Sequence, residues 1–328
     1  MTRAVVTGGR GFVGSHLVDR LVARGDEVTV FDTGRRATQA ARRHVDARFV
    51  TGDIRNPDEL AAVITKDVDV VYHLAAVVGV DQYLATPLDV IDTNFTGTRN
   101  VLERAAEAGT RLVLASTSEV SGMNPAVPWT EDADRVLGST SVNRWSYSSS
   151  KALAEHLTFA FVRQRGLDAS IVRYFNLYGP RQRPAFLISR TVHRCLNGLP
   201  PIVYDEGKQT RTFTSVHDAV GATVRIGASE AASGECFNVG NSTEMTIQEA
   251  VELIVELTGC DAGTKSIDTE QSFGVTYQDL GRRVPDTTKL RTLIGARCDT
   301  GLREGVTRLV EWAAANPWWL ELEDDSPS

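Results

Sequence analysis

Residues 7–25, TGGRGFVGSHLVDRLVARG, decide how this chain folds. They follow a short apolar run at residues 4–8, and their later part has the apolar spacing of a helix. Gly8, Gly11 and Gly14 stand three residues apart at the junction between the two patterns. Glycines at a strand–turn–helix junction let the backbone approach a pyrophosphate, which then lies at the positive end of the helix. The stretch therefore predicts a dinucleotide-binding turn, and the alternative is a tight turn without a ligand.

Short apolar runs alternate with helical patterns through the first half of the chain. The predicted strands are residues 4–8, 27–32, 47–53, 68–76, 111–117 and 169–179, and the predicted helices lie near residues 12–24, 57–65, 87–108 and 146–165. Most of these strands are apolar on both faces, which is typical of a parallel sheet covered by helices. The alternation predicts an α/β fold, a Rossmann-type doubly wound parallel sheet that binds ligands at the carboxyl ends of its strands.

The pattern changes after residue 179. The later elements are a loop and helix from residue 180, a strand at residues 236–241, and helices at residues 246–259 and 302–319, the second of which is closed by Asn316-Pro317. We expect an NAD-binding domain over residues 1–178, with residues 212–241 returning to it. A smaller lobe is expected over residues 179–328.

Composition excludes several classes of protein. Hydrophobic residues make up 42% of the 328 residues, which is enough for a sizeable core, and the formal net charge of −7 argues against a nucleic-acid partner. No apolar run approaches the ~18 residues of a membrane span, so no membrane partner is expected. The four cysteines are far apart in the sequence, which predicts reduced thiols in a cytoplasmic protein and no metal site.

Two acidic residues end predicted strands near the glycine turn. Asp32 can accept both hydroxyls of the adenosine ribose of NAD and repel the 2′-phosphate of NADP, whereas the nearby Arg35 and Arg36 could instead meet that phosphate. Asp53 and Ile54 follow the third strand, where they could contact the adenine edge; the alternative for Asp53 is a helix cap. Other residues that we place in the cofactor site are Phe12, Val13, Leu74, Ala75, Ala76, Tyr147 and Lys151.

Tyr147 and Lys151 are four residues apart, so they share one face of a predicted helix. An ammonium group beside a phenol, with the positive nicotinamide nearby, favours the phenolate and makes Tyr147 a base near neutral pH. This pair occurs often by chance. Its order in the chain is more specific, because it follows the glycine turn, Asp32 and a polar strand end, and it precedes the segment RYFNLYGPRQ at residues 173–182.

With this order of features, nearly the whole sequence resembles the extended short-chain dehydrogenase/reductases. Most members of that family act on nucleotide sugars with a tightly held NAD, so the resemblance implies that the lobe at residues 179–328 binds the nucleotide sugar. The resemblance implies that Thr117 binds the sugar hydroxyl that is oxidised, that Tyr147 takes its proton, and that Lys151 holds the nicotinamide ribose. It also implies a homodimer formed through the helices near residues 87–108 and 146–165.

The same resemblance implies a set of substrate contacts. Asn176 would contact the phosphate side of the nucleotide sugar, Arg211 would pair with its diphosphate, and Arg181 belongs to the same site. The alternative for Arg211 is a surface loop charge. For Asn94 the family suggests a support near the active centre, and a polar contact within its helix is equally plausible.

The segment STSEVSG at residues 116–122 separates three branches of the family. The 4-epimerases usually lack an acid at the position of Glu119, and the 4,6-dehydratases carry an aspartate at the position of Ser118. Glu119 combined with Ser118 resembles the UDP-glucuronate decarboxylases. So do the segments NRWSYSSSK and YQDLGRRVPDTTKLR, and the second of these implies that Arg283 lies near the sugar carboxylate.

Decarboxylation explains why a second acid is dispensable. Oxidation at C4 of a glucuronate creates a ketone β to the C6 carboxylate, so carbon dioxide leaves without an acid to expel a hydroxyl. The NADH then returns its hydride to give UDP-xylose, or the 4-keto-pentose is released first. Glu119 and Ser118 would act at this end of the sugar.

Several alternatives stay open from the sequence. Glu119 could form an ion pair at the strand end, and Ser118 could be a simple turn hydroxyl. A TDP-sugar could replace the UDP-sugar, and Ser121 stands where the family usually has tyrosine. The chemistry could be that of a 4,6-dehydratase or 4-epimerase. The other class of function is an NAD-sensing regulator, which typically lacks the pair formed here by Tyr147 and Lys151.

Overall fold

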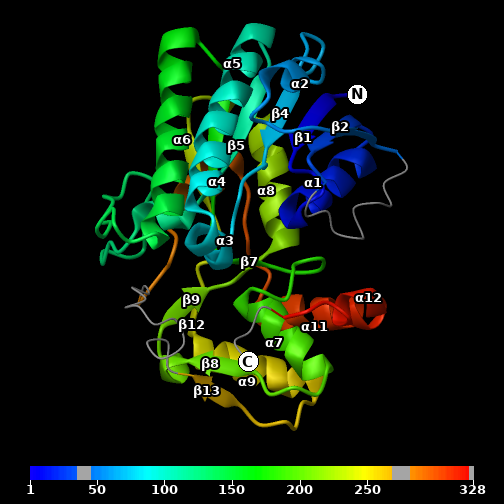
Figure 1. Cartoon of the computed structure of the whole chain (residues 1–328), viewed down its shortest axis with the longest axis vertical. Coiled ribbons are helices and arrows are strands. Elements are labelled where there is room, and N and C mark those ends of the chain that lie inside the picture. Colours follow the sequence, from blue (N-terminus) through cyan, green and yellow to red (C-terminus); the bar gives the residue numbers. More distant parts are fainter. Residues whose placement is uncertain (35–45, 268–280, 325–328) are drawn as a thin grey trace. The chain divides into compact units, whose positions relative to one another are not determined.

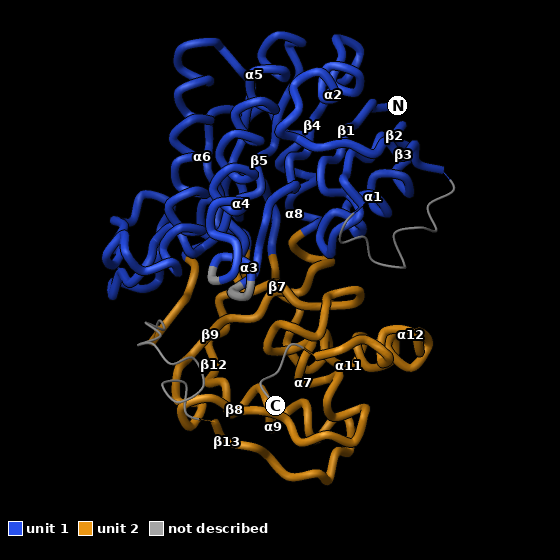
Figure 2. Tube along the Cα trace, in the orientation of Figure 1, with its two compact units in different colours: residues 1–174, 220–239, 286–297 blue, residues 175–219, 240–285, 298–328 orange. Residues whose placement is uncertain are grey.

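A computed structural model describes residues 1–34, 46–267 and 281–324 (Figure 1). Contacts divide the chain into two compact units, each of which is described by itself (Figure 2). Unit 1 comprises residues 1–174, 220–239 and 286–297, and unit 2 comprises the described residues of 175–219, 240–285 and 298–328.

The division differs from the predicted one at residues 175–178, which belong to unit 2, and at residues 286–297, which belong to unit 1 and not to the lobe. The backbone N–H of Asp286 donates to the carbonyl oxygen of Trp129 at 2.8 Å, and the Asn238 amide donates to the carbonyl oxygen of Asp286 at 3.2 Å. These hydrogen bonds join segments far apart in the sequence, which is why the pattern of residues did not indicate them. The returning segment is also shorter than predicted, at residues 220–239.

A seven-stranded parallel sheet forms the centre of unit 1, in the spatial order β11-β6-β5-β4-β1-β2-β3. The strands are β1 (Arg3–Thr7), β2 (Glu27–Asp32), β3 (Arg48–Thr51), β4 (Val70–His73), β5 (Arg111–Thr117), β6 (Ala169–Tyr174) and β11 (Cys236–Val239). This confirms the predicted Rossmann-type sheet. The strand order reverses between β1 and β4, and such a switch point is where open α/β sheets bind ligands.

Helices connect the parallel strands of unit 1. They are α1 (Phe12–Ala23), α2 (Pro57–Ala61), α3 (Val80–Ala85), α4 (Pro87–Ile91), α5 (Thr98–Ala108), α6 (Arg144–Arg165) and α8 (Val216–Ala228), the last of which begins in unit 2. The helix predicted near residues 87–108 is interrupted by a π-helical turn, Asp92–Gly97. Such π-helical turns are frequent at functional sites.

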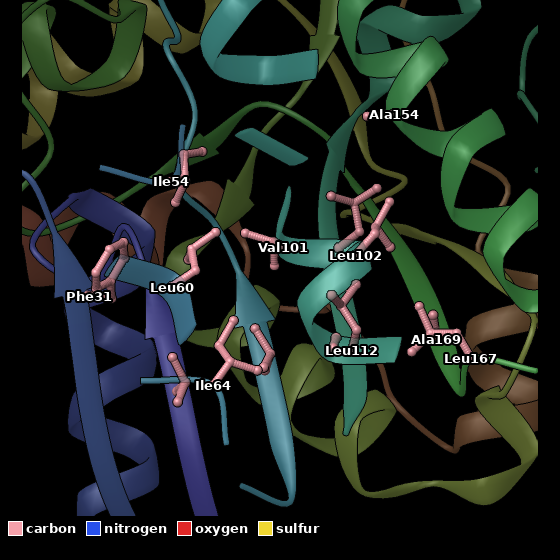
Figure 3. Close-up of a cluster of buried hydrophobic side chains, with 14 of the residues drawn as sticks. Phe31, Ile54, Leu60, Ile64, Val101, Leu102, Leu112, Ala154, Leu167 and Ala169 are labelled. Atoms are coloured by element: carbon pink, nitrogen blue, oxygen red, sulfur yellow. The ribbon is translucent and has the colours of Figure 1, made fainter. Parts of the chain in front are cut away.

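Buried apolar side chains pack one face of the sheet against α2, α5 and α6 (Figure 3). Phe31 and Leu112 come from strands, and Leu60, Leu102 and Ala154 come from the three helices. All five are at most 1% exposed. Burial of each of the larger side chains contributes about 1.5–3 kcal/mol, so this core holds α6 firmly beside the end of β5.

Unit 2 contains three two-stranded sheets and a helical core. Its strands are β7 (Leu177–Tyr178), β8 (Ile202–Tyr204), β9 (Thr210–Thr212), β10 (Thr214–Ser215), β12 (Glu244–Thr246) and β13 (Lys265–Ile267), and its helices are α7 (Leu187–Leu196), α9 (Ile247–Thr258), α11 (Leu302–Ala314) and α12 (Pro317–Leu320). Val192, Ile254, Leu309 and Trp319 are fully buried between these helices.

One predicted strand is too long. The strand predicted at residues 169–179 stops after Tyr174, because Asn176 has a positive φ of 39° and turns the chain before β7. The closure predicted at Asn316-Pro317 is confirmed, because the helix that begins at Leu302 ends at Ala314 and Pro317 begins a separate short helix.

Candidate active site

The glycine turn places backbone atoms where a side chain would not fit. Gly8 has a φ of 72°, and a Cβ at this position would lie 2.6 Å from the backbone nitrogen of Ala75. A Cβ on Gly14 would lie 2.2 Å from the carbonyl oxygen of Gly8. Gly11 is the N-cap of α1, and no side chain caps this helix within the described residues. The positive end of the helix can therefore face an anionic group.

A cavity of about 280 Å³ opens beside this turn, and unit 1 alone lines it. The predicted cofactor residues that line it are Gly8, Gly11, Asp32, Asp53, Ile54, Leu74, Ala75 and Ala76. Seven further lining residues were not predicted, namely Phe31, Thr33, Gly52, Arg55, Val77, Asp89 and Thr93. Five predicted residues do not line this cavity, namely Phe12, Val13, Gly14, Tyr147 and Lys151. The cavity and the glycine cradle fit the adenosine and pyrophosphate parts of a dinucleotide.

Asp32 is fixed at the edge of the cavity. Its carboxylate accepts hydrogen bonds from the backbone N–H of Arg10 at 3.0 Å and of Gly34 at 2.8 Å. This places a hydrogen-bond acceptor at the end of β2, as a ribose diol requires. Arg35 and Arg36, which represent the alternative of NADP, lie outside the described residues.

Asp53 does not cap a helix, so that alternative is wrong. The N-cap of α2 is Asn56, whose side chain accepts from the backbone N–H of Asp58. Asp53 instead forms an ion pair with Arg55 at 2.6 Å, and Arg55 also pairs with Asp89 at 2.9 Å. The three charged side chains form one wall of the cavity.

The polar end of β5 continues into a short 3₁₀ turn, Ser118–Ser121. The Thr117 hydroxyl accepts a hydrogen bond from the backbone N–H of Glu119 at 3.2 Å. The Ser148 hydroxyl of α6 donates to the carbonyl oxygen of Glu119. Ser118 is 1% exposed, whereas the Glu119 side chain is only partly buried. The segment is therefore held against the helix that carries Tyr147 and Lys151.

Tyr147 and Lys151 lie on α6 beside β5. Tyr147 is 6% exposed, and its ring stacks on Tyr83 with 6.5 Å between ring centroids. Lys151 Nζ donates to the carbonyl oxygen of Ala115 at 2.6 Å. Burial lowers the pKa of Lys151 to about 8, and the Glu155 carboxylate acts in the opposite direction. At neutral pH an ammonium group therefore remains one helical turn from the Tyr147 phenol and favours its ionised form.

His73 is a structural residue in the described part of unit 1. Its Nδ1 is 2.7 Å from the Thr7 hydroxyl, and its Nε2 is 3.0 Å from the Thr98 hydroxyl. Burial, with a smaller contribution from Lys151, lowers the pKa of His73 to about 3. The imidazole is therefore neutral near pH 7 and joins β1 and β4 to the start of α5.

Asn94 supports the cavity wall from the π-helical turn. Its side chain accepts from the backbone N–H of Val77 at 2.8 Å and donates to the Val77 carbonyl oxygen at 3.1 Å. It also donates to the Ser150 hydroxyl at 3.3 Å. The alternative of a polar contact within its own helix is wrong, because all three bonds reach other segments.

The predicted substrate-binding residues all belong to unit 2. The Asn176 amide donates to the Thr212 carbonyl oxygen at 2.9 Å and accepts from Arg283 at 3.3 Å, so the structure brings Asn176 and Arg283 together. Arg211 lies on β9 and is 8% exposed, so the surface-loop alternative is wrong. Arg181 is partly buried and has a positive φ of 69°. Of the predicted catalytic residues, Arg283 therefore belongs to unit 2, whereas Thr117, Glu119 and Tyr147 belong to unit 1.

A search of the described residues finds no group of histidine, cysteine and acidic side chains that could hold a metal ion. The helices within the same ranges are all too short or too polar to cross a membrane.

Comparisons with known proteins identify the family. The family model described as the NAD dependent epimerase/dehydratase family matches residues 4–240. The chain belongs to this family. NAD is therefore its cofactor, as the sequence predicts, and the resemblance to the nucleotide-sugar branch of the short-chain dehydrogenase/reductases is confirmed.

Curated relatives are similar to this chain over most of its length. The chain is 36% identical to the UDP-N-acetyl-alpha-D-glucosaminuronate decarboxylase of Bacillus cytotoxicus, over 98% of this chain and 99% of the relative. It is 36% identical to UDP-glucuronic acid decarboxylase 4 of Arabidopsis thaliana, over 94% of this chain and 68% of the relative.

Solved structures show the same fold. The UDP-glucose 4-epimerase of Thermotoga maritima, solved with UDP-glucose, has a TM-score of 0.88 and 27% identity, with 96% of this chain and 100% of the other covered. MoeE5, solved in complex with UDP-glucuronic acid and NAD, has a TM-score of 0.84 and 30% identity, with 95% and 99% covered.

Proposed function

We propose that this family member is an NAD-dependent UDP-glucuronate decarboxylase. The observation that carries the proposal is the end of β5, where Glu119 is the acidic residue of the STSEVSG segment. Its backbone carbonyl oxygen accepts a hydrogen bond from Ser148 of α6, the helix that carries Tyr147 and Lys151. A 4,6-dehydratase needs a second acid here to expel a hydroxyl. The names of the relatives support the same choice, because both of those described above are decarboxylases of a nucleotide-linked uronate.

The first step is oxidation at C4 of the sugar. NAD, when bound, accepts the hydride that leaves C4. Thr117 orients the C4 hydroxyl, and Tyr147 removes its proton as a general base. Lys151 stabilises the phenolate with its positive charge and binds the nicotinamide ribose.

The second step breaks the bond between C5 and C6. The electron pair of that bond moves toward the C4 ketone as an enolate, and carbon dioxide leaves. Arg283 binds the sugar carboxylate before this step, and the negative Glu119 favours its conversion into a neutral molecule. A water molecule that Glu119 orients then delivers a proton from solvent to C5. Ser118 binds at the same end of the sugar and supplies no acid.

Asn176, Arg181 and Arg211 bind the nucleotide diphosphate in this proposal. Their guanidinium and amide groups offer the charge-assisted hydrogen bonds that phosphate oxygens prefer. Arg211 lies on β9 and is 8% exposed, and one of its guanidinium nitrogens donates to the carbonyl oxygens of Thr210 at 2.8 Å and Gly281 at 3.4 Å.

A uronate with a 2-acetamido group is a second candidate substrate. The Bacillus cytotoxicus relative is named for such a substrate and matches this chain over nearly its full length. Ser121 is 3% exposed and stands where the family usually has tyrosine, so a smaller side chain occupies this position.

The test offers purified protein UDP-glucuronate, UDP-N-acetylglucosaminuronate, UDP-glucose and TDP-glucose in separate reactions, with mass spectrometry of the products. Loss of the carboxyl group from a uronate supports the proposal and identifies the preferred sugar. Loss of water from either glucose nucleotide, without action on the uronates, would show a dehydratase instead. The same spectra distinguish UDP-xylose from a released 4-keto-pentose.

We also propose a cytoplasmic homodimer. Leu88 and Ile91 of α4 are 76% and 41% exposed, and Leu153 of α6 is 46% exposed. Side chains of this kind are typical of a helical interface between two copies of a chain. Light scattering should give twice the chain mass for the wild type. A Leu88→Glu/Leu153→Glu variant should give the monomer mass, and an unchanged mass would place the interface elsewhere.

A further inference from the structure

We propose that Glu155 is a positioning residue for Tyr147 and Lys151, a role that rests on the proposed function of this pair. Glu155 holds α6 against the end of β5 and provides a fixed negative charge one helical turn from Lys151. It is not among the residues that line the cofactor cavity, and it reaches the active pair through its charge beside Lys151 and through its hydrogen bond with Ser116.

The Glu155 carboxylate connects three elements of unit 1. The Ser116 hydroxyl of β5 donates to its Oε1 at 2.5 Å. Arg173 of β6 donates to both carboxylate oxygens, at 2.9 Å and 2.7 Å. Glu155 is 5% exposed, and the Arg173 side chain is 11% exposed. A buried, bidentate pair of this kind fixes geometry as well as charge.

Ser116 lies on β5 between a residue that contacts Lys151 and a residue that is predicted to contact the substrate. On one side is Ala115, whose carbonyl oxygen accepts the hydrogen bond from Lys151. On the other side is Thr117, which is predicted to bind the sugar hydroxyl. Because Glu155 and Lys151 share a face of α6, the bond from Ser116 to Glu155 sets how the helix meets both residues.

Several titratable groups from the surrounding elements lie near Glu155 and the Tyr147–Lys151 pair. The titratable groups around the pair and around Glu155 are His73 of β4, Tyr83 of α3, Glu119 after β5, Glu131 and Arg135 before α6, Arg173 of β6 and Cys236 of β11. His73 is neutral near pH 7, and burial raises the pKa of Cys236 far above its ordinary value. Burial alone would lower the pKa of Arg173, but the hydrogen bonds and charge of Glu155 raise it above its usual range.

Loss of the Glu155 charge should change proton transfer at Tyr147. In a Glu155→Gln variant, the Arg173 cation stays buried without its partner, and Lys151 loses the negative charge that opposes its desolvation. The pKa of Lys151 then falls, so the lysine is neutral over more of the pH range. A neutral lysine stabilises the phenolate less, and the pKa of Tyr147 rises.

The experiment compares pH profiles of kcat for the wild type and four variants. Glu155→Gln should lower kcat at neutral pH by about 10- to 100-fold. It should also move the acidic limb of the profile, where Tyr147 loses its proton, to higher pH by about half a pH unit or more. Glu155→Asp keeps the charge and should return the limb toward the wild-type position. Glu155→Gln/Arg173→Met removes both charges and should shift the limb in the same direction but less. Ser116→Ala keeps the charges and should lower kcat without moving the limb.

A purely structural Glu155 gives a different pattern. Its variants would lose thermal stability and kcat while the limb stays in place, and that result would overturn the proposal. If Glu155→Gln does not fold, the Glu155→Asp and Glu155→Gln/Arg173→Met variants test the proposal. A double variant whose acidic limb and kcat both equal those of the wild type would also contradict the positioning role.

A direct titration separates this proposal from the proposed function. The near-ultraviolet absorbance of the Tyr147 phenolate is obtained from each protein minus its own Tyr147→Phe counterpart, in the NAD-loaded enzyme without substrate. An upward shift in Glu155→Gln supports the positioning role even if no nucleotide sugar is turned over. An unchanged titration in a folded Glu155→Gln variant contradicts it even if UDP-glucuronate is decarboxylated.

Discussion

The nucleotide-binding edge of unit 1 and the arginine residues of unit 2 are positioned in different ways. In unit 1 the backbone sets position, since a Cβ on Gly14 would lie 2.2 Å from the Gly8 carbonyl oxygen. In unit 2 a side-chain hydrogen bond of 3.3 Å joins Asn176 to Arg283, two residues that are 107 positions apart. The comparison indicates that the glycine turn follows from local sequence, whereas the contact between the two predicted substrate residues depends on long-range folding.

Tyr147→Phe should have the largest effect on catalysis. Loss of a general base costs about 10²- to 10⁴-fold, so kcat should fall on this scale while NAD content stays unchanged. The matched control is Tyr178→Phe in unit 2, which removes a hydroxyl without a hydrogen-bond partner among the described residues. Stopped-flow absorbance of NADH formation measures both variants. A kcat within tenfold of the wild type would contradict the assignment of Tyr147 as the base.

Gly14→Ala tests the backbone contact of unit 1. The added Cβ would clash with the Gly8 carbonyl oxygen, and overpacking of this kind costs about 1–3 kcal/mol of stability. We expect loss of most bound NAD and a lower free energy of unfolding, measured by cofactor release and urea titration. The control is Gly221→Ala on α8, where a Cβ would meet no atom within 4 Å. Equal NAD content in the two variants would contradict the claim that the close backbone contact at Gly14 is needed to bind NAD.

Arg283→Gln tests the side-chain contacts of unit 2. A lost hydrogen bond to a charged group costs about 1.5–3 kcal/mol, so kcat/KM for UDP-glucuronate should fall by about 10- to 100-fold with NAD content unchanged. The neighbouring Arg282→Gln is the control, since Arg282 is 58% exposed and pairs with Glu244 at 2.7 Å. An exposed pair contributes about 0–1 kcal/mol, so this variant should behave as the wild type. If the two variants lose activity equally, the special role of Arg283 is wrong.

Asp32→Asn should have the smallest effect of the four. The amide keeps one acceptor oxygen but loses the charge that repels a 2′-phosphate, so the preference for NAD over NADP should fall by about tenfold. Calorimetric titration of both dinucleotides measures the change. Asp58→Asn on the exposed start of α2 is the control and should keep the wild-type preference. An unchanged preference in Asp32→Asn would assign cofactor choice to other residues.

The sequence predicts unit 1 better than unit 2 because the turn of unit 1 depends on local spacing, whereas unit 2 depends on contacts between distant residues. Gly8, Gly11, Gly14 and Asp32 act within a continuous strand–turn–helix segment, whose spacing is visible in the chain. The turn at Asn176 is not visible, because asparagine tolerates a positive φ without any change in the apolar pattern around it.

Residues missed at the site share one property. Arg55, Asp89 and Thr93 reach the cavity from segments whose own patterns indicate only helices and loops. Glu155 could have been noticed, since it stands four residues after Lys151 and so lies on the same helical face. Its partner Arg173 comes from β6, and no local pattern connects the two.

The most direct test of the central claim uses UDP-glucuronate with an isotopic carbon label in its carboxylate. The wild type should release labelled carbon dioxide and leave an unlabelled nucleotide pentose or 4-keto-pentose, whereas Tyr147→Phe should release almost no label. A sugar nucleotide that is oxidised, dehydrated or epimerised while it keeps the label would contradict decarboxylation by this chain.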